Sequence, residues 1–406
     1  MIKKDTFLSN SFIFFLGSFV IGLGGYAFHF LMVRMLLIEE YGELQSLLAV
    51  FSIFGIPLSA LAAVLMRYAA DFKEQLGLGK IKALTLYFSK IAVFFAIVCF
   101  LALLFLGKSV SGFLNITSTW PLLILAAALI PSFLGVVNKG IIQGLEKFKT
   151  VSIIGIVEVI TKISFAFLLV LVGFKTSGVM LAILASIAIG CLISFLPLLS
   201  LLKEEKETIQ IKDIYNYFIL SLFGISFLSL LFNMDVILAK HFLNNLAAGE
   251  YAGLALLGKI VFFLAGPIAT VMFPVVNSPQ IFKKAFWLTF LIGGLPVLGY
   301  FLFPDFIIKL LIGQSFLGIS RVLGYFGLAM LSYSLINLFS QYFLALKEKG
   351  FSFFLLIGAL LEIILISFWH NNISQIVFCI NLVNFLVLIC LAGYYIFKNK
   401  TIWLKN

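Results

Sequence analysis

The chain has 406 residues, of which 63% are apolar and only 11% charged, and its mean hydropathy is +1.18. A soluble domain carries about 25% charged residues, so the composition excludes a soluble protein and indicates an all-α polytopic membrane protein. The formal net charge of +11 would suit a nucleic-acid partner, but the placement of the charges, given below, excludes that class.

Twelve segments are long and apolar enough to cross a bilayer, which takes roughly 20 residues. In chain order they are 8–33, 43–66, 85–107, 118–137, 150–172, 177–202, 214–239, 249–276, 284–303, 318–344, 350–369 and 373–397. An amphipathic stretch precedes the third segment, and GGLPVLG interrupts the ninth. The first apolar run continues to Val33 with no small-x-small cleavage site, so we interpret it as a retained helix rather than a signal peptide.

Lys and Arg alternate in number from one loop to the next. Loops on the N-terminal side carry 20 of the 28 Lys and Arg residues, the opposite loops carry six, and two lie inside spans. Cytoplasmic loops carry the excess of Lys and Arg, so we expect both termini in the cytoplasm. The positive charge is therefore a topological signal, with some added attraction to anionic headgroups.

The most polar connection, KEEKETIQIKD at 203–213, lies at the midpoint of the chain. We interpret it as a cytoplasmic linker between an N-terminal six-helix bundle, 1–202, and a C-terminal six-helix bundle, 214–406.

Sequence similarity between the two halves indicates an internal repeat. Residues 39–66 align with 249–276 at a constant offset of 210, and GLEKFK aligns with ALKEKG at an offset of 201. In the first alignment Glu40-Tyr41 matches Glu250-Tyr251, and Pro57 matches Pro267. Two halves of equal orientation are related by an axis along the membrane normal, which predicts a substrate site between them.

Sequence motifs of enzymes and metal sites are absent. The longest outer loop, about 304–317, has some fourteen residues, too few to carry the active site of a membrane glycosyltransferase, ligase or polymerase. There is no phosphate-binding loop, His-x-x-x-His pair or Gly-x-Ser-x-Gly. The three histidines are scattered, although folding could bring them together, and the four cysteines lie in apolar segments without metal-ligand spacing. We therefore expect no enzyme activity, no metal and no cofactor.

Five charged residues lie inside predicted spans, where each costs about 2.5–3.5 kcal/mol at a helix centre. They are Glu158, Lys162, Asp235, Lys259 and Glu362. Glu158 and Lys162 are four residues apart and share one helix face. They either neutralise each other or line a central cavity, where Lys162 would bind an anionic substrate and Glu158 would carry a proton.

Asp235 lies about five residues before the outer end of the seventh predicted span, and Lys259 lies about nine residues into the eighth span from the same end. The two spans form one hairpin. We predict that Asp235 and Lys259 pair, either as a staple of the hairpin or as a gate whose lysine is released to a substrate phosphate. Glu362, in GALLEIILISF, has no charged neighbour in sequence and is a candidate for proton coupling. Alternatively, it pairs across helices with Lys162 or hydrogen-bonds to a Ser or Asn.

Other polar residues and prolines complete the candidate site. Arg34 and Arg67 either anchor helix ends or line the mouths of a cationic cavity. His29 is another candidate for the cavity, or a hydrogen-bonding residue between helices. Amides that we expect to face the bundle interior are Asn337, Gln341, Asn381 and Asn384. Candidate hinges, or tolerated kinks, are Pro57, Pro267 and Pro296.

Two hairpins carry a resemblance to a known family. FLMVRMLLIEEYGELQSLLAVFSIFGIPLSALAAVLMRYAAD (30–71) resembles the first two helices of the polysaccharide-exporter branch of the multidrug/oligosaccharidyl-lipid/polysaccharide flippase superfamily. NMDVILAKHFLNNLAAGEYAGLALL (233–257) is similar to the seventh-to-eighth helix passage of that branch, except that Leu238-Ala239-Lys240 stands where the family has Leu-Gly. Phe28 and His29 replace the Arg-Asp pair of the peptidoglycan-precursor flippases, and two extra helices are missing, which argues against that substrate.

The resemblance implies a V-shaped pair of six-helix bundles in the bacterial or archaeal cytoplasmic membrane. It implies a flippase that takes the sugar–diphosphate headgroup of a polyprenyl-linked glycan into a cationic cavity, while the lipid tail stays in the bilayer. Alternating access would be driven by an H⁺ or Na⁺ gradient or by the membrane potential. The alternatives are a multidrug/cation antiporter of the same superfamily, a transporter of another superfamily, and a cell-envelope membrane enzyme such as a glycosyltransferase or polymerase.

Overall fold

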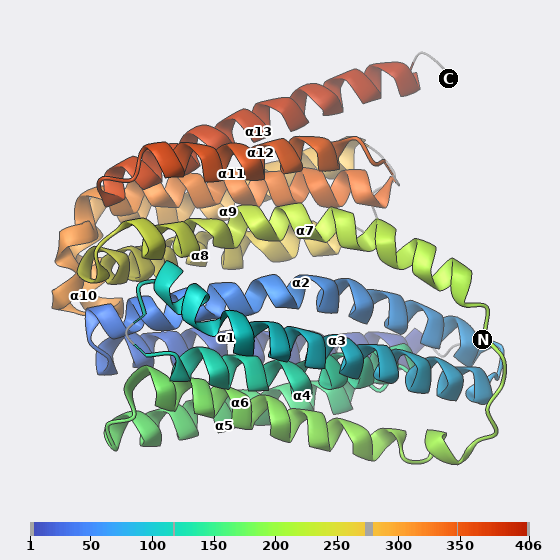
Figure 1. The fold of residues 1–406 in the computed structure, drawn as a ribbon. Coiled ribbons are helices and arrows are strands. Elements are labelled where there is room, and N and C mark those ends of the chain that lie inside the picture. The colour runs from blue at the N-terminus through green and yellow to red at the C-terminus, as the bar shows by residue number, and fades with distance from the viewer. Residues whose placement is uncertain (1–3, 117, 273–278, 347, 404–406) are drawn as a thin grey trace. The chain divides into compact units, whose positions relative to one another are not determined.

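The computed structural model describes residues 4–116, 118–272, 279–346 and 348–403. Every regular element in these ranges is a helix (Figure 1). The α-helices are α1 (Lys4–Met35), α2 (Ile38–Glu74), α3 (Leu78–Phe113), α4 (Trp120–Gly144), α5 (Phe148–Leu171), α6 (Lys175–Phe195), α7 (Ile211–Phe242), α8 (Asn245–Met272), α9 (Pro279–Leu302), α10 (Pro304–Leu311), α11 (Ser320–Ala345), α12 (Phe351–Phe368) and α13 (Ile373–Trp403). Three short 3₁₀ helices are η1 (Leu196–Leu198), η2 (Leu201–Lys203) and η3 (Gln314–Ile319).

Membrane-spanning helices dominate the chain. Among the described residues, 11 helices are long and apolar enough to cross a bilayer. Helix α7, with 32 residues, falls on the remaining predicted span, and several of its side chains lie outside the described set. The all-α polytopic fold expected from the composition is confirmed, because a helix satisfies its own backbone hydrogen bonds in lipid.

Several predicted span limits are wrong. Helix α3 begins at Leu78, so the amphipathic stretch before the third span belongs to the same helix. Helix α4 continues to Gly144, and α9 runs unbroken through GGLPVLG with Pro296 inside. The outer segment 304–317 contains α10 and most of η3. Polar residues extend a helix beyond the apolar run that sequence analysis detects, because helix ends project into the headgroups and water.

The chain divides into two compact units. The first unit comprises Met1–Leu36 and Phe54–Leu222, and the second comprises Leu37–Ile53 and Phe223–Asn406. One of the three boundaries lies in the connection between α1 and α2, and the other two lie inside the long helices α2 and α7. The division of the sequence at the polar segment 203–213 stays a proposal; in the structure this segment leads from η2 into the start of α7.

Helix packing within each unit determines the positions of the charged residues that form the candidate functional site. In the first unit α5 packs on α1 and α6, and α4 packs on α3 and α6. In the second unit α11 packs on α8, α9 and α13, and α12 packs on α13. Buried aromatic and aliphatic residues of α9, α11, α12 and α13 form a core in the second unit, in which the Phe282 and Tyr342 rings lie 4.6 Å apart.

Candidate functional site

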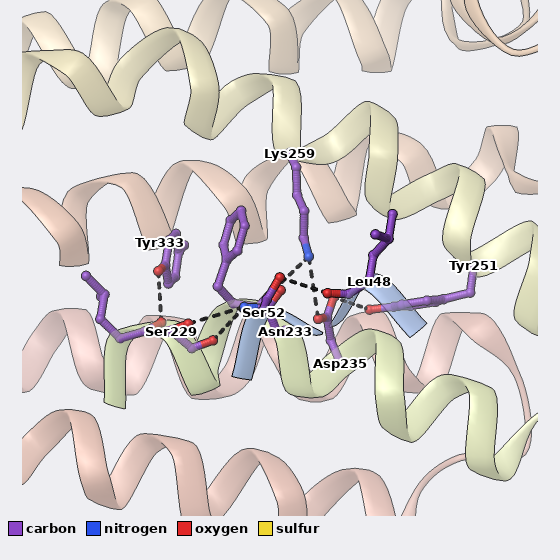
Figure 2. Close-up of polar contacts among 10 residues, drawn as sticks. Leu48, Ser52, Ser229, Asn233, Asp235, Tyr251, Lys259 and Tyr333 are labelled. Carbon is purple, nitrogen blue, oxygen red and sulfur yellow. Dashed lines mark hydrogen bonds and ion pairs between the residues drawn. The ribbon is translucent and has the colours of Figure 1, made fainter. Parts of the chain in front are cut away.

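A buried group of polar side chains joins α7 to α8 in the second unit (Figure 2). The Tyr251 hydroxyl donates a hydrogen bond of 2.8 Å to Asp235 Oδ2, and Lys259 Nζ lies 3.9 Å from Asp235 Oδ1. Tyr251 and Lys259 are eight residues apart on α8, so both reach the same side of the helix. The Asp235 side chain is only 2% exposed. The predicted pairing of Asp235 with Lys259 is present in the structure.

The Lys259 ammonium has three kinds of partner on α7. Besides the carboxylate, Nζ donates a hydrogen bond of 2.7 Å to the Phe232 carbonyl oxygen and lies 4.2 Å from the centre of the Phe232 ring. An ammonium has three donors, and an aromatic face attracts a cation, more strongly where water is excluded. These contacts hold the Lys259 ammonium against one turn of α7.

Aromatic rings form a wall beside this ammonium. The Phe232 ring centre lies 5.0 Å from the ring centres of both Phe262 and Tyr333, which are themselves 5.1 Å apart. The Tyr333 hydroxyl donates a hydrogen bond of 2.9 Å to the Leu228 carbonyl oxygen on α7. The wall fixes the rotamer of Phe232 and limits the access of water to the lysine.

Glu362 contributes a second carboxyl group from α12. It is fully buried, and the structure records no hydrogen-bond partner for either of its carboxyl oxygens among the described residues. The charged groups close enough to interact with it electrostatically are Asp235 and Lys259. We call Asp235, Tyr251, Lys259 and Glu362 the α7–α8–α12 cluster. With both carboxyl groups ionised the cluster has a net charge of −1, and one proton makes it neutral.

The first unit holds a different arrangement. Glu158 on α5 forms an ion pair of 2.5 Å with Lys139 on α4, not with Lys162, so a private pair of Glu158 and Lys162 is wrong. Lys139 lies in the last turns of α4 and not in a loop. The predicted span ended at residue 137, so the prediction placed Lys139 outside the helix. Lys162 remains within electrostatic reach of Glu158, and its Nζ lies 4.5 Å from the centre of the Phe28 ring on α1.

The structure also places the remaining candidates. Arg34 occupies the last turn of α1 and Arg67 a position inside α2, and both side chains are exposed. The His29 ring lies edge-on to Phe28, 5.2 Å between centres. Asn337 is buried on α11, and Gln341, one turn later, is half-buried.

Two amides on α13 join that helix to α11. Asn381 Nδ2 donates to the Tyr325 carbonyl oxygen at 3.0 Å, and Asn384 Nδ2 to the Ala329 carbonyl oxygen at 3.0 Å. Pro57, Pro267 and Pro296 all lie inside continuous helices, α2, α8 and α9. Their role as hinges stays a prediction.

Sequence reasoning missed two residues of the charged groups, Tyr251 and Lys139. The repeat did provide a signal for the first, because Tyr251 matches Tyr41, and both tyrosines are fully buried. A buried tyrosine hydroxyl needs a partner, which Asp235 provides for Tyr251 and Gln45 for Tyr41 at 2.5 Å. Nothing near Lys139 in sequence pointed to Glu158.

Comparison with known proteins gives one family. The family model described as "Polysaccharide biosynthesis protein" matches residues 7–282, about two thirds of the chain. This chain belongs to that family. It is a multi-pass membrane protein, as its helices require. A comparison with curated proteins gives no match.

Solved structures with a similar fold are transporters of the MOP superfamily. An inward-facing multidrug resistance MATE family transporter is 12% identical, with a TM-score of 0.76, and the match covers 93% of this chain and 95% of that one. The lipid II flippase MurJ in an inward closed conformation is 14% identical, with a TM-score of 0.74, and the match covers 95% and 87%. A MOP superfamily transporter from Pyrococcus furiosus is 14% identical, with a TM-score of 0.58, covering 95% and 92%. At these identities the likeness shows the fold.

Proposed function

We propose that this protein is a flippase that moves a polyprenyl-diphosphate-linked oligosaccharide or polysaccharide precursor across the cytoplasmic membrane by alternating access. The observation that carries the proposal is the family match over residues 7–282 of a chain made of membrane-spanning helices. The lipid II flippase among the similar folds supports a lipid-linked glycan as the class of substrate.

Buried cations support the diphosphate as the group that is recognised. In the first unit Lys139 takes the Glu158 carboxylate at 2.5 Å, and Lys162 lies half-buried on the same helix as Glu158 with its ammonium over the Phe28 ring. An ammonium held mainly by an aromatic face can exchange that contact for a stronger charge-assisted hydrogen bond to phosphate. We therefore assign Lys162 to the substrate phosphate.

The α7–α8–α12 cluster supports ion coupling. A carboxyl group buried without a hydrogen bond is costly as an anion, and Glu362 is in that position. We propose that Glu362 carries the coupling proton and that Lys259 responds to its charge by changing its distance to Asp235, now 3.9 Å. The membrane potential or an H⁺ gradient would then drive transport.

The test is translocation of a labelled polyprenyl-diphosphate sugar in proteoliposomes that contain the purified protein. We expect the protein to accelerate headgroup transfer, Lys162→Gln to slow it by about tenfold and Lys162→Arg to retain most of it. Lys149→Gln is the matched control, because it removes the same charge from an exposed position on the same helix, α5. No acceleration by the parent protein would refute the proposed function.

A multidrug/cation antiporter is the second candidate. The carboxyl groups of Asp235 and Glu362, both buried, suit a cationic substrate, and MATE transporters share the fold. Accumulation of a cationic dye in the same proteoliposomes separates the two. Dye transport without headgroup transfer would favour the antiporter.

A further inference from the structure

A cavity opens at one end of the second unit, between the α7–α8 connection and the α12–α13 connection, which lie at the same end in Figure 1. Its volume is about 540 Å³, within the roughly 300–1,000 Å³ that is usual for small-molecule sites. None of its lining residues belongs to the α7–α8–α12 cluster. The transport mechanism proposed above leaves this cavity without a role.

Two of the lining amides are held in place by the helices they begin. Asn244 Oδ1 accepts a hydrogen bond of 2.8 Å from the Ala247 backbone N–H at the start of α8, and Asn372 Oδ1 accepts one of 2.9 Å from the Gln375 N–H at the start of α13. Each cap occupies the amide oxygen. The Nδ2 donors of both residues remain for a ligand in the cavity, and Asn371 adds a further amide with an exposed side chain.

An aromatic surface forms another part of the wall. The Phe242 and His370 rings are stacked, with centres 4.0 Å apart and planes at 19°. His370 Nδ1 lies 3.0 Å from the Ile366 carbonyl oxygen, so that contact fixes the ring, and Nε2 is left for a ligand. Rigid apolar faces next to fixed amides suit a ligand that has both C–H faces and hydroxyl groups.

Charge narrows the class of ligand. Glu250, half-buried, is the one acidic residue of the wall, and the described lining residues include no Lys or Arg. A diphosphate would meet a carboxylate and no cation, so the headgroup phosphate does not suit this cavity. A carboxylate accepts hydrogen bonds from hydroxyl groups, which are both donors and acceptors and match the amide donors as well.

A second cavity adjoins the first and lengthens the site. It has a volume of about 340 Å³ and shares Asn372 and Ser374 with the first cavity. Its wall also contains Trp369, Gln375 and Phe378, and the Trp369 side chain is 50% exposed. An exposed aromatic ring beside an amide repeats the chemistry of the first cavity. The two together suit more than one sugar unit.

We infer that these two cavities are a carbohydrate subsite that holds neutral sugar units of the transported glycan. The inference rests on the proposed function, because it assigns the sugar part of that substrate to a place separate from the cations expected to bind its phosphates. The Lys and Arg distribution predicts that this end of the second unit faces the outer side of the membrane. The subsite would therefore hold the glycan after it crosses.

Binding of the detergent-solubilised full-length protein to an immobilised array of neutral, phosphate-free and lipid-free bacterial oligosaccharides tests the inference. We expect saturable binding to at least one oligosaccharide. Asn371→Ala should weaken it by about fivefold to tenfold, the usual effect of losing a hydrogen bond to a ligand. Asn372→Asp keeps the cap of α13 but exchanges the amide donor for a negatively charged group that only accepts hydrogen bonds, so it should weaken binding to a similar extent without lowering the thermal stability.

Gln314→Ala is the matched control, since it removes an exposed amide from η3 outside both cavities. Absence of binding to every oligosaccharide, or binding that both Asn variants leave unchanged, would overturn the inference. Binding of a cationic dye at this place in preference to any sugar would overturn it too. Headgroup transfer in proteoliposomes without glycan binding would refute the subsite and leave the proposed function intact. Glycan binding without headgroup transfer would refute the proposed function and leave a glycan-binding site.

Discussion

The two units bury charge in different ways. In the first unit Lys139 and Glu158 are 2.5 Å apart, their side chains are 28% and 20% exposed, and Lys162 lies within electrostatic reach of the same carboxylate. In the second unit Lys259 lies 3.9 Å from Asp235, whose side chain is 2% exposed, and Glu362 adds a buried carboxyl group without a hydrogen-bond partner among the described residues.

Under the proposed function, the close Lys139–Glu158 pair would maintain structure and the α7–α8–α12 cluster would exchange a proton. A close ion pair such as Lys139–Glu158 offsets the cost of removing both charges from water. The α7–α8–α12 cluster has two carboxyl groups for one ammonium, so a proton or a cation must enter or leave for its charge to balance. An ionisable residue inside a membrane is a functional hypothesis by default, which applies to this cluster.

Breaking the ion pair of Asp235 and Lys259 in the second unit should have the largest effect on the free energy of unfolding. Asp235→Asn leaves the Lys259 ammonium buried without its carboxylate, which should lower the free energy of unfolding by about 3 kcal/mol. The double variant Asp235→Asn/Lys259→Met removes both charges and should recover more than half of that loss. Denaturant unfolding in mixed micelles measures both, and a double variant as unstable as the single one would show that the pair is not coupled.

The first unit's pair can be broken without touching either charge. Gly190 on α6 packs directly against the Glu158 carboxyl group, and a Cβ at this position would collide with it. We expect Gly190→Ala to push Glu158 away from Lys139 and to destabilise the protein by about 2 kcal/mol. Thermal unfolding measures the change.

Gly135→Ala provides the control for this substitution. Its Cβ would lie 3.6 Å from Cys191 Cβ, an ordinary contact distance in the same unit. It should not destabilise the protein, and it should raise the stability by at most the roughly 0.5–1 kcal/mol that alanine gains over glycine inside a helix. Equal melting temperatures for the two alanine variants would mean that the contact between Gly190 and Glu158 does not hold the ion pair in place.

The sequence predicts the fold well and the charged groups only in part. Each of the twelve predicted apolar segments corresponds to a different long α-helix, although 177–202 continues through η1 into η2 and 318–344 begins in η3. A helix satisfies its own backbone hydrogen bonds in lipid. The pairing of Asp235 with Lys259 was predictable, since the two lie on adjacent helices at similar depth. The partner of Glu158 was not, because local spacing favours Lys162 whereas packing of α4 on α5 brings Lys139 closer.

Tertiary packing also decides the positions of Tyr251 and Glu362. The hydroxyl of Tyr251 reaches Asp235 only because of the rotation of α8 about its own axis relative to α7, which an apolar pattern does not encode. Glu362 lies on α12, more than 100 residues after Lys259, and comes within electrostatic reach of it only through folding of the second unit. Helix patterns predict which residues are buried, and packing decides their partners.

Neutralising the extra carboxyl group tests the functional half of the comparison. Glu362→Gln keeps the shape of the side chain and removes its proton, so we expect the fold to persist and gradient-driven transport to fall by roughly tenfold, equivalent to about 1.4 kcal/mol in the barrier. The pH dependence of transport should become flat, whereas the parent's stays steep. Glu74→Gln, an exposed change at the end of α2, is the control. An unchanged pH profile in Glu362→Gln would remove this residue from coupling.

A more accessible ion pair, with side chains 35% and 29% exposed, lies at the ends of helices in the second unit. Glu348, between α11 and α12, accepts hydrogen bonds from Lys398 at 2.9 Å and from the Tyr394 hydroxyl at 3.1 Å. The bond from Lys398, and after it that from Tyr394, lowers the pKa of the Glu348 carboxyl below its usual 4.5, against the opposing effect of partial burial. A lowered pKa stabilises the folded state fully above the pKa of the unfolded chain, and this stabilisation is lost as the pH falls through the lowered value.

The expected effect of this pair is the smallest, because water screens an ion pair whose side chains are about a third exposed. Glu348→Gln should lower the melting temperature near pH 7 by only about 1 °C. The difference from the parent should disappear as the pH falls below the usual carboxyl value of 4.5. Melting curves at pH 7, 5 and 4 measure it, with Glu74→Gln again as the control. A loss as large as that of Asp235→Asn would mean that burial does not distinguish the pairs, and the contrast between the two units would then rest on charge balance alone.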